Sequence, residues 1–135
     1  MGTVPTVKSV MTPFPYSVEE DSPVGEALEF MRRHKIRHLP VTRAGELIGV
    51  VSDRDIKLML GPDFAYPDAG ELRVKDAMVE DPYIVDFATP LHTVLNRMAE
   101  QHIGSAIVTR NGKLVGVFTS TDACRAFADY LTSGR

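Results

Sequence analysis

The chain contains an internal duplication, which constrains its fold more than any other feature of the sequence. Residues 7–60 recur as residues 74–127 at a constant offset of 67 positions, with no insertion or deletion, and a third of the aligned residues are identical. A domain of about 150 residues buries roughly two-thirds of the surface that its unfolded chain exposes, whereas a unit of about 60 residues is marginal alone. We therefore expect two halves that pack face to face.

Each half is predicted to fold as β-α-β-β-α. Residues 15–18 and 82–85 begin with proline and are typical of edge strands. Ser22-Pro23 and Thr89-Pro90 predict helix starts, with the hydroxyl residue at the N-cap and proline as the first helical residue. Apolar residues at helical spacing follow both starts, so we expect one amphipathic helix in each half.

A β-hairpin and a second helix complete each half. The hairpin turns are predicted at Ala44-Gly45 and at Asn111-Gly112, and Asn-Gly is a strong hairpin signal. The final helices are expected to start near Asp53 and near Thr121. The paired strands are predicted at residues 36–42 with 47–51, and 103–109 with 114–118.

The predicted fold class is therefore mixed α/β (α+β), with three segments along the chain. Residues 7–60 form the first repeat and residues 74–130 the second. Residues 61–73 form a linker, because residues 61–70 are rich in turn formers.

The composition is that of an ordinary globular protein, with 44% hydrophobic and 24% charged residues. No apolar run approaches the roughly 20 residues that span a bilayer. The N-terminus lacks the features of a secretory signal, so a cytoplasmic location is expected. The net charge of −3 disfavours binding to nucleic acid or to an anionic membrane. Cys124, the single cysteine, is expected to be buried and inert in the last helix.

Both hairpins end in the same pattern, Gly-apolar-apolar-(Ser/Thr)-x-x-Asp. It runs to Ser52 and Asp55 in the first half, and to Thr119 and Asp122 in the second. A hydroxyl residue is a good helix N-cap, so capping alone is one interpretation. It leaves unexplained why an aspartate stands in both halves. A carboxylate at a sheet edge can accept two hydrogen bonds from a vicinal diol such as ribose.

A basic stretch at residues 32–38 is the second candidate for a functional site. Its first four side chains suit a helix C-terminus and are expected to be solvated. Arg37 and His38 differ, since they start a strand whose hairpin partner carries Ser52. Arg37 could hold a phosphate in fork geometry and His38 could donate to it. Gly104 and Ser105 replace them in the second half, so the two clefts should differ in charge.

No catalytic or metal-binding set is predicted. The four histidines lack metal-ligand spacing, no base lies near Cys124 in the sequence, and no phosphate-binding loop motif occurs. We therefore expect a protein that is not an enzyme.

The chain resembles a tandem pair of cystathionine-β-synthase (CBS) domains, called a Bateman module. The resemblance rests on the β-α-β-β-α repeats, on the stretch Ile-Arg-His-Leu-Pro-Val, and on the stretch Gly-Glu-Leu-Ile-Gly-Val-Val-Ser-Asp-Arg-Asp with its copy. The resemblance covers about residues 7–130. It implies two repeats packed sheet to sheet about a pseudo-two-fold axis, with two clefts between them. Such pairs commonly bind AMP, ADP or ATP, and sometimes S-adenosylmethionine or reduced nicotinamide nucleotides. They usually regulate an attached enzyme, transporter or channel, and associate as disc-like dimers.

The resemblance also implies roles for particular residues. In the first cleft, Asp55 would hold the ribose, Ser52, Arg54, Arg37 and His38 would lie at the phosphates, and Val74, Met78 and Ile103 would face the adenine. In the second cleft, Asp122 would hold the ribose, Thr119 and Thr121 would lie at the phosphates, and Val7, Met11 and Ile36 would face the adenine.

Three functions follow from these observations. The first is a sensor that binds an adenine nucleotide and transmits its state through a homodimer interface. The second is a ligand-free dimerisation or interaction module. The third, nucleic acid binding through the basic stretch, is disfavoured by the net negative charge and by the missing counterpart in the second half.

Overall fold

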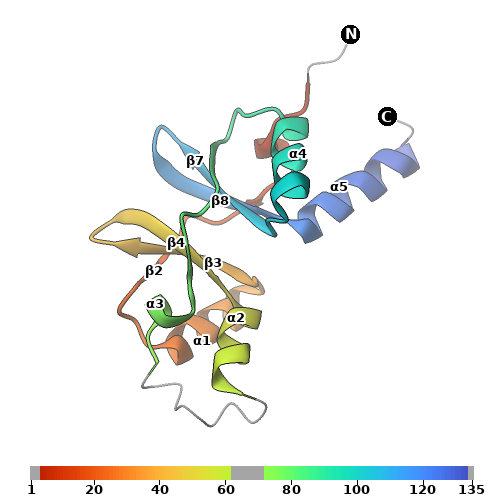
Figure 1. Ribbon diagram of the computed structural model, residues 1–135. Coiled ribbons are helices and arrows are strands. Elements are labelled where there is room, and N and C mark those ends of the chain that lie inside the picture. The colour runs from red at the N-terminus through yellow and green to blue at the C-terminus, as the bar shows by residue number, and fades with distance from the viewer. Residues whose placement is uncertain (1–3, 62–71, 134–135) are drawn as a thin grey trace. The chain divides into compact units, whose positions relative to one another are not determined.

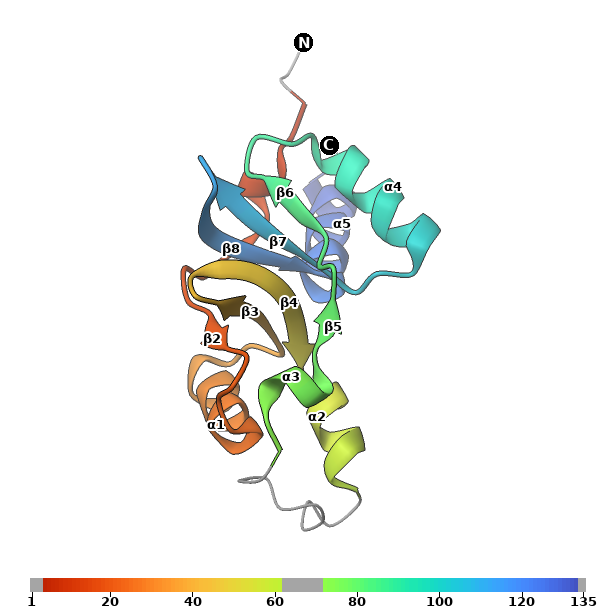
Figure 2. The ribbon, with the colours of Figure 1, turned by 60° about the vertical axis from the view of Figure 1, so that its left-hand side comes forward.

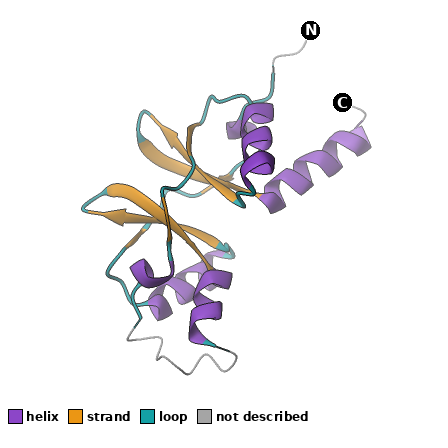
Figure 3. Ribbon diagram, viewed as in Figure 1, coloured by secondary structure: helices purple, strands orange, loops and turns teal. Residues whose placement is uncertain are grey.

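The computed structural model describes residues 4–61 and 72–133 (Figure 1). Most of the predicted linker, residues 61–73, lies outside the described residues. Figure 3 separates the helices from the strands. The helices are a 3₁₀ turn, Val7–Ser9, and α1 (Val24–His34), α2 (Asp53–Leu60), α3 (Val74–Ala77), α4 (Leu91–Gln101) and α5 (Ser120–Ser133).

The described strands form two four-stranded sheets, which confirms the mixed α/β fold class. One sheet has the order β2-β3-β4-β5 and the other the order β1-β8-β7-β6. Each contains one predicted hairpin and one predicted edge strand, and this edge strand runs parallel to its neighbour. The strands are β1 (Thr12–Pro13), β2 (Val18–Glu19), β3 (His38–Arg43), β4 (Glu46–Ser52), β5 (Val79–Glu80), β6 (Ile84–Asp86), β7 (Ser105–Arg110) and β8 (Lys113–Thr119).

The compact units do not coincide with the sequence repeats, because the two halves exchange their first segments. One unit is Tyr16–Pro82, and the other combines the segment up to Pro15 with Tyr83 onwards. In the first unit the exchanged β5 pairs with β4 (Figure 2), and in the second β1 pairs with β8. Backbone hydrogen bonds join each exchanged segment to the other repeat: Val7 N donates to Thr89 O, and Val74 N donates to Ser22 O. The predicted sheet-to-sheet packing of the two repeats remains a prediction.

The glycine of the shared pattern is required by this exchange. A Cβ on Gly116 would lie 2.8 Å from Thr12 O and 2.6 Å from Met11 Sδ. A Cβ on Gly49 would lie 2.8 Å from Val79 O and 2.9 Å from Met78 Sδ. Only a residue without a side chain lets the exchanged strand approach so closely.

The hairpin turns form as predicted. Ala44 and Gly45, and likewise Asn111 and Gly112, have positive φ angles between 51° and 84°. Two consecutive left-handed residues are the signature of the type I′ turn, whose twist matches that of the strands. The strands begin later than predicted, at His38 and Ser105.

The predicted N-caps are wrong by one residue. Pro23 and Pro90 occupy the cap positions, no side chain caps either helix, and the helices begin at Val24 and Leu91. The exchanged segments bind these helix starts instead, because Val24 N donates to Leu72 O and Leu91 N to Pro5 O. A backbone carbonyl therefore accepts the hydrogen bond from the helix start that a capping hydroxyl was expected to accept.

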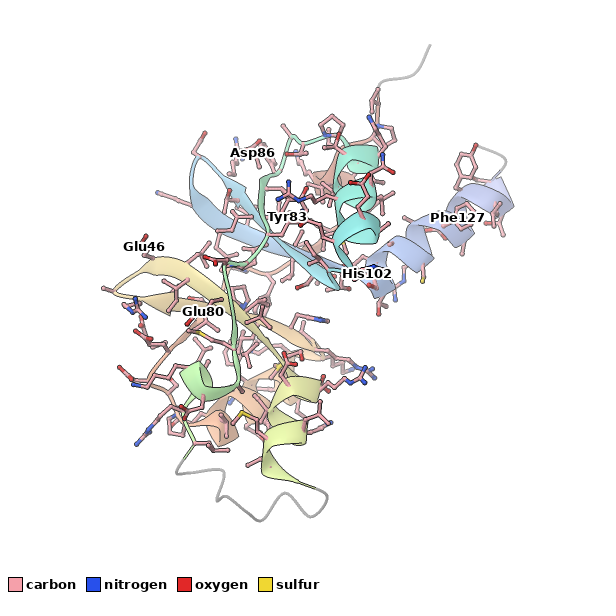
Figure 4. All side chains as sticks on the ribbon, in the orientation of Figure 1. Glu46, Glu80, Tyr83, Asp86, His102 and Phe127 are labelled. Carbon is pink, nitrogen blue, oxygen red and sulfur yellow. The ribbon has the colours of Figure 1, made fainter. Side chains whose placement is uncertain are left out.

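The last helices of the two repeats are covered to different extents. Ile56 and Leu60 of α2 are buried, whereas Asp122 is the one buried residue of α5. Phe127, the counterpart of Leu60, is 62% exposed (Figure 4). Cys124 is also exposed, so the prediction of a buried thiol is wrong. The side of α5 that carries Cys124 is not covered by other elements of its unit. Composition and helical periodicity could not predict this.

Candidate functional site

Ser52 and Asp55 form a reciprocal cap at the start of α2. Asp55 N donates to Ser52 Oγ over 3.0 Å, and Ser52 N donates to Asp55 Oδ2 over 3.4 Å. Such a capping box satisfies two backbone donors that a helix start otherwise leaves unpaired. It also explains an aspartate three residues after the hydroxyl, so the interpretation of Asp55 as a residue that capping does not account for is wrong.

Asp122 caps α5 in the same way but is held more tightly. Its Oδ2 accepts from Thr119 N over 2.9 Å and from Thr119 Oγ1 over 3.2 Å. Its Oδ1 accepts from Thr12 Oγ1 over 2.9 Å, across the exchanged strand. Asp122 is 6% exposed. Both carboxylate oxygens therefore have partners.

Asp55 lacks this additional partner. The position that corresponds to Thr12 is Val79, which has no hydroxyl to donate. Within residues 4–61 and 72–133, only Oδ2 of Asp55 accepts a hydrogen bond, and the side chain is half-buried. Its Oδ1 is thus available to a ligand hydroxyl.

A pocket of about 370 Å³ lies beside Asp122. It is lined by residues 9–13 of the exchanged segment and by Asp122, Arg125, Ala126 and Asp129 of α5. Arg125 Nη1 lies 4.0 Å from Asp122 Oδ1. Two carboxylates face one guanidinium, so this pocket does not favour a phosphate.

The pocket brings together two of the residues predicted for the second cleft, Met11 and Asp122. Thr119 is joined to Asp122 through the cap, whereas Thr121 is exposed and Val7 is fully buried in the core. Ile36 belongs to the other compact unit, so its place beside Asp122 stays a prediction. Thr12 and Arg125 were missed. The pairing of polar Thr12 with apolar Val79 in the repeat alignment was a signal for Thr12.

The residues predicted for the first cleft fall into several groups. His38 pairs with Ser52 across the hairpin, which places a basic group beside the cap of Asp55. Met78 lies against Gly49 on the strand that ends in Ser52. Arg54 is exposed and Val74 is fully buried. Ile103 packs on the core of the other unit, so its contact with a ligand at Asp55 stays a prediction.

Arg37 lines a separate pocket. This pocket lies between α1 and α2 and has a volume of about 420 Å³. Asp53 of α2 also lines it, and Asp53 N donates to Arg37 O over 3.0 Å. Neither Asp55 nor Ser52 is among its lining residues. The contact of Arg37 with a phosphate bound at Asp55 therefore stays a prediction.

The described residues contain neither a candidate metal site nor a candidate membrane span. No group of three or more His, Cys, Asp or Glu side chains in this part of the chain could hold a metal ion. No helix between residues 4 and 61 or between 72 and 133 is long and apolar enough to cross a bilayer.

The model of the CBS domain family matches residues 7–61 and again residues 74–129. The chain belongs to the CBS domain family. The two matches reproduce the duplication, so the chain is a CBS pair, and CBS pairs are generally regulatory modules.

Relatives of this CBS pair include both short proteins and larger ones. It is 30% identical over 129 residues to hypoxic response protein 1 of Mycobacterium tuberculosis, covering 93% of this chain and 87% of the relative. It is 32% identical over 121 residues to zinc metalloprotease MJ0392 of Methanocaldococcus jannaschii, covering 90% of this chain and 32% of the relative. The chain spans less than a third of the length of the first curated relatives that it matches.

Solved structures share the fold. CBSX2 of Arabidopsis thaliana is 28% identical with a TM-score of 0.75, covering 96% of this chain and 99% of CBSX2. A structure of CBSX2 in complex with AMP is 26% identical with a TM-score of 0.73, covering 92% and 97% of the two chains. A CBS pair of this fold therefore binds an adenine nucleotide.

Proposed function

We propose that this CBS pair is a sensor of adenine nucleotides (AMP, ADP or ATP), with its tighter site at Asp55. The observation that carries the proposal is the free Oδ1 of Asp55 on a half-buried carboxylate. The AMP complex of CBSX2 supports the choice of ligand class. Hydrogen bonds from ribose hydroxyls to a charged oxygen contribute about 1.5–3 kcal/mol each.

The other residues at this site have supporting roles in the proposal. Ser52 positions Asp55 through the capping box. His38, beside Ser52 in the hairpin, and Arg54 and Arg37 would contact the phosphates. Met78 and Ile103 would face the adenine, with Val74 behind them in the core.

We propose that the site at Asp122 is weaker and holds an uncharged or weakly charged adenosine moiety. Here Thr12 already occupies the carboxylate oxygen that a ribose would use, so a ligand must displace this hydroxyl. Met11 lines the pocket, and Thr119 holds the carboxylate. The residues predicted to contact a ligand at Asp122 also include Thr121, Val7 and Ile36.

Titration calorimetry with AMP, ADP and ATP tests the proposal. Asp55→Ala should weaken the tighter binding event by roughly 10- to 100-fold, which corresponds to about 1.5–3 kcal/mol. Asp55→Asn is the matched control for capping, since the amide oxygen can still accept from Ser52 N. We expect Asn at this position to preserve the fold and to weaken the nucleotide. Absence of binding up to millimolar concentration would refute the proposal.

The alternative is a ligand-free module that acts through self-association. The capping boxes favour it, because they account for both aspartates without a ligand. The face of α5 also favours it, since Phe127, Tyr130 and Leu131 are 58–63% exposed and lie on one side of the helix. A homodimer through this face is part of both proposals. A melting temperature that does not respond to AMP or ATP would favour the ligand-free module, because a ligand of the native state must raise it.

A further inference from the structure

We propose that the pocket between α1 and α2 binds a small, multiply charged anion, a polyphosphate group in particular, at a site separate from Asp55. Four cationic side chains line the pocket: Arg32, Lys35, Arg37 and Lys57. Figure 1 shows the two helices that form its walls. One acidic side chain, Asp53, faces these cations, so the lining carries a net charge of about +3.

Two of the four cations have no ion-pair partner within the described residues. Arg32 is paired with Glu29, and Lys57 Nζ lies 3.4 Å from Asp53 Oδ2. Lys35 and Arg37 form no ion pair in the described part of the chain. Lys35 also adopts the left-handed conformation, with φ 57°. Unpaired cations at one pocket repel each other, and a bound anion would remove this repulsion.

The duplication provides an internal reference for this pocket. Its apolar lining is retained in the second repeat, where Leu95, Met98 and Ile103 correspond to Leu28, Met31 and Ile36. Its cations are not retained: Ala99, His102, Gly104 and Cys124 correspond to Arg32, Lys35, Arg37 and Lys57. The fold therefore needs the apolar lining but not the cations. A place at a helix C-terminus accounts for Arg32, Lys35 and Lys57 one by one. It does not account for Arg37, or for the gathering of all four cations at one pocket in a chain with a net charge of −3.

The pocket lies on the far side of α2 from the proposed ribose carboxylate. Asp53 and Lys57 are four residues apart and share one face of the helix. Asp55 follows Asp53 by about 200° around the helix axis, and so points to the opposite face. A ligand in this pocket would leave the space beside Asp55 open, and Arg37 is the one residue that this proposal and the proposed site at Asp55 both use.

The shape of the site favours a compact anion over a nucleic acid. A nucleic acid needs an extended basic face along which successive phosphates bind. Here the four cations line one pocket of about 420 Å³ together with the apolar side chains of Leu28, Met31 and Ile36. A guanidinium binds phosphate oxygens in fork geometry and an ammonium group adds a point charge, which suits a di- or triphosphate.

Tripolyphosphate is the appropriate probe, because it carries neither adenine nor ribose. Calorimetric titrations would compare the intact chain with Lys35→Asn/Lys57→Gln, which removes two charges and keeps a residue that tolerates the left-handed conformation. Arg110→Gln/Lys113→Gln, at the second hairpin turn, removes the same charge away from the pocket. Asp55→Asn tests independence from the nucleotide site.

We expect tripolyphosphate to bind the intact chain at low salt and to bind Lys35→Asn/Lys57→Gln at least about tenfold more weakly. The control pair and Asp55→Asn should stay within about twofold, and the affinity should fall steeply with added salt. The proposal is overturned by no binding up to the order of ten millimolar, by an equal loss in the control pair, by loss in Asp55→Asn, or by tighter, pocket-dependent binding of duplex DNA. Failure of AMP to bind would leave this result unaffected, so the two proposals fail separately.

Discussion

The two Ser/Thr-x-x-Asp junctions share one sequence pattern but differ in what their carboxylates can do. Asp55 is half-buried and uses one oxygen in its cap, whereas Asp122 is 6% exposed and uses both. The difference comes from the exchanged strand, which brings Thr12 to Asp122 and Val79 to the corresponding position. A duplicated motif therefore does not guarantee a duplicated function, because residues distant in sequence decide which atoms stay free.

The largest expected effect comes from filling the space that the exchanged strand uses. In Gly116→Ala the new Cβ would meet Thr12 O at 2.8 Å, which the backbone can relieve only by moving β1 away. We expect the free energy of unfolding to fall by about 2–3 kcal/mol. Urea denaturation measures this loss, and loss of the Thr12–Asp122 hydrogen bond would make Asp122 resemble Asp55.

Gly112→Asn is the control for the glycine substitution. No atom lies within 4 Å of a Cβ at Gly112, and Asn tolerates its φ of 78°. A change in unfolding free energy of no more than about 0.5 kcal/mol is expected there. If Gly116→Ala is equally harmless, the close approach of β1 does not explain the glycine of the shared pattern.

An exchange of side chains between the two sites should have an intermediate effect. Thr12→Val removes a donor to a buried carboxylate, which should cost about 1–2 kcal/mol of unfolding free energy. The reciprocal Val79→Thr offers Asp55 a hydroxyl and should reduce AMP binding at that site by a few fold. Denaturation and calorimetry on both variants measure these changes. Tighter AMP binding by Val79→Thr would contradict the view that a free Oδ1 makes Asp55 the better site.

The sequence predicted the fold well where the signals were local and strong. The hairpins and helices of both repeats were predicted from three signals: the duplication, Asn111-Gly112 and the helical spacing of apolar residues. The exchange of first segments was not predicted, since β1 and β5 are two residues long and show no periodicity. Thr12 was missed for this reason, as its partner Asp122 lies 110 residues away. The exposure of Cys124 depends on how α5 packs, which helical spacing alone does not determine.

The smallest expected effect is a pH dependence that distinguishes the units. In Tyr16–Pro82, Glu20 accepts a hydrogen bond from Arg43, and this lowers the pKa of the Glu20 carboxyl. Lys75 donates to Asp21 over 2.9 Å and lowers the pKa of that carboxyl as well. In the other unit Phe87 replaces Glu20, and Lys8 and Arg110 lie over its ring at 5.2 Å and 5.1 Å. A ring does not titrate, so of these two corresponding positions only Glu20 in the first unit should make a contribution that responds to acid.

The sign follows from the lowered pKa values. A carboxyl whose pKa is lower in the folded state stabilises the fold above its unfolded pKa, and this contribution is lost as the pH falls through the folded value. Glu20→Gln should therefore be slightly less stable than the intact chain near neutral pH, and the difference should vanish in acid. Phe87→Leu should lose the same stability at every pH, since cation–π contacts persist while lysine and arginine stay charged. Hydrogen exchange at β3 and at β7, measured from neutral pH into acid, reports the stability of each unit separately. A pH-independent effect of Glu20→Gln would show that the ion pair contributes nothing to stability.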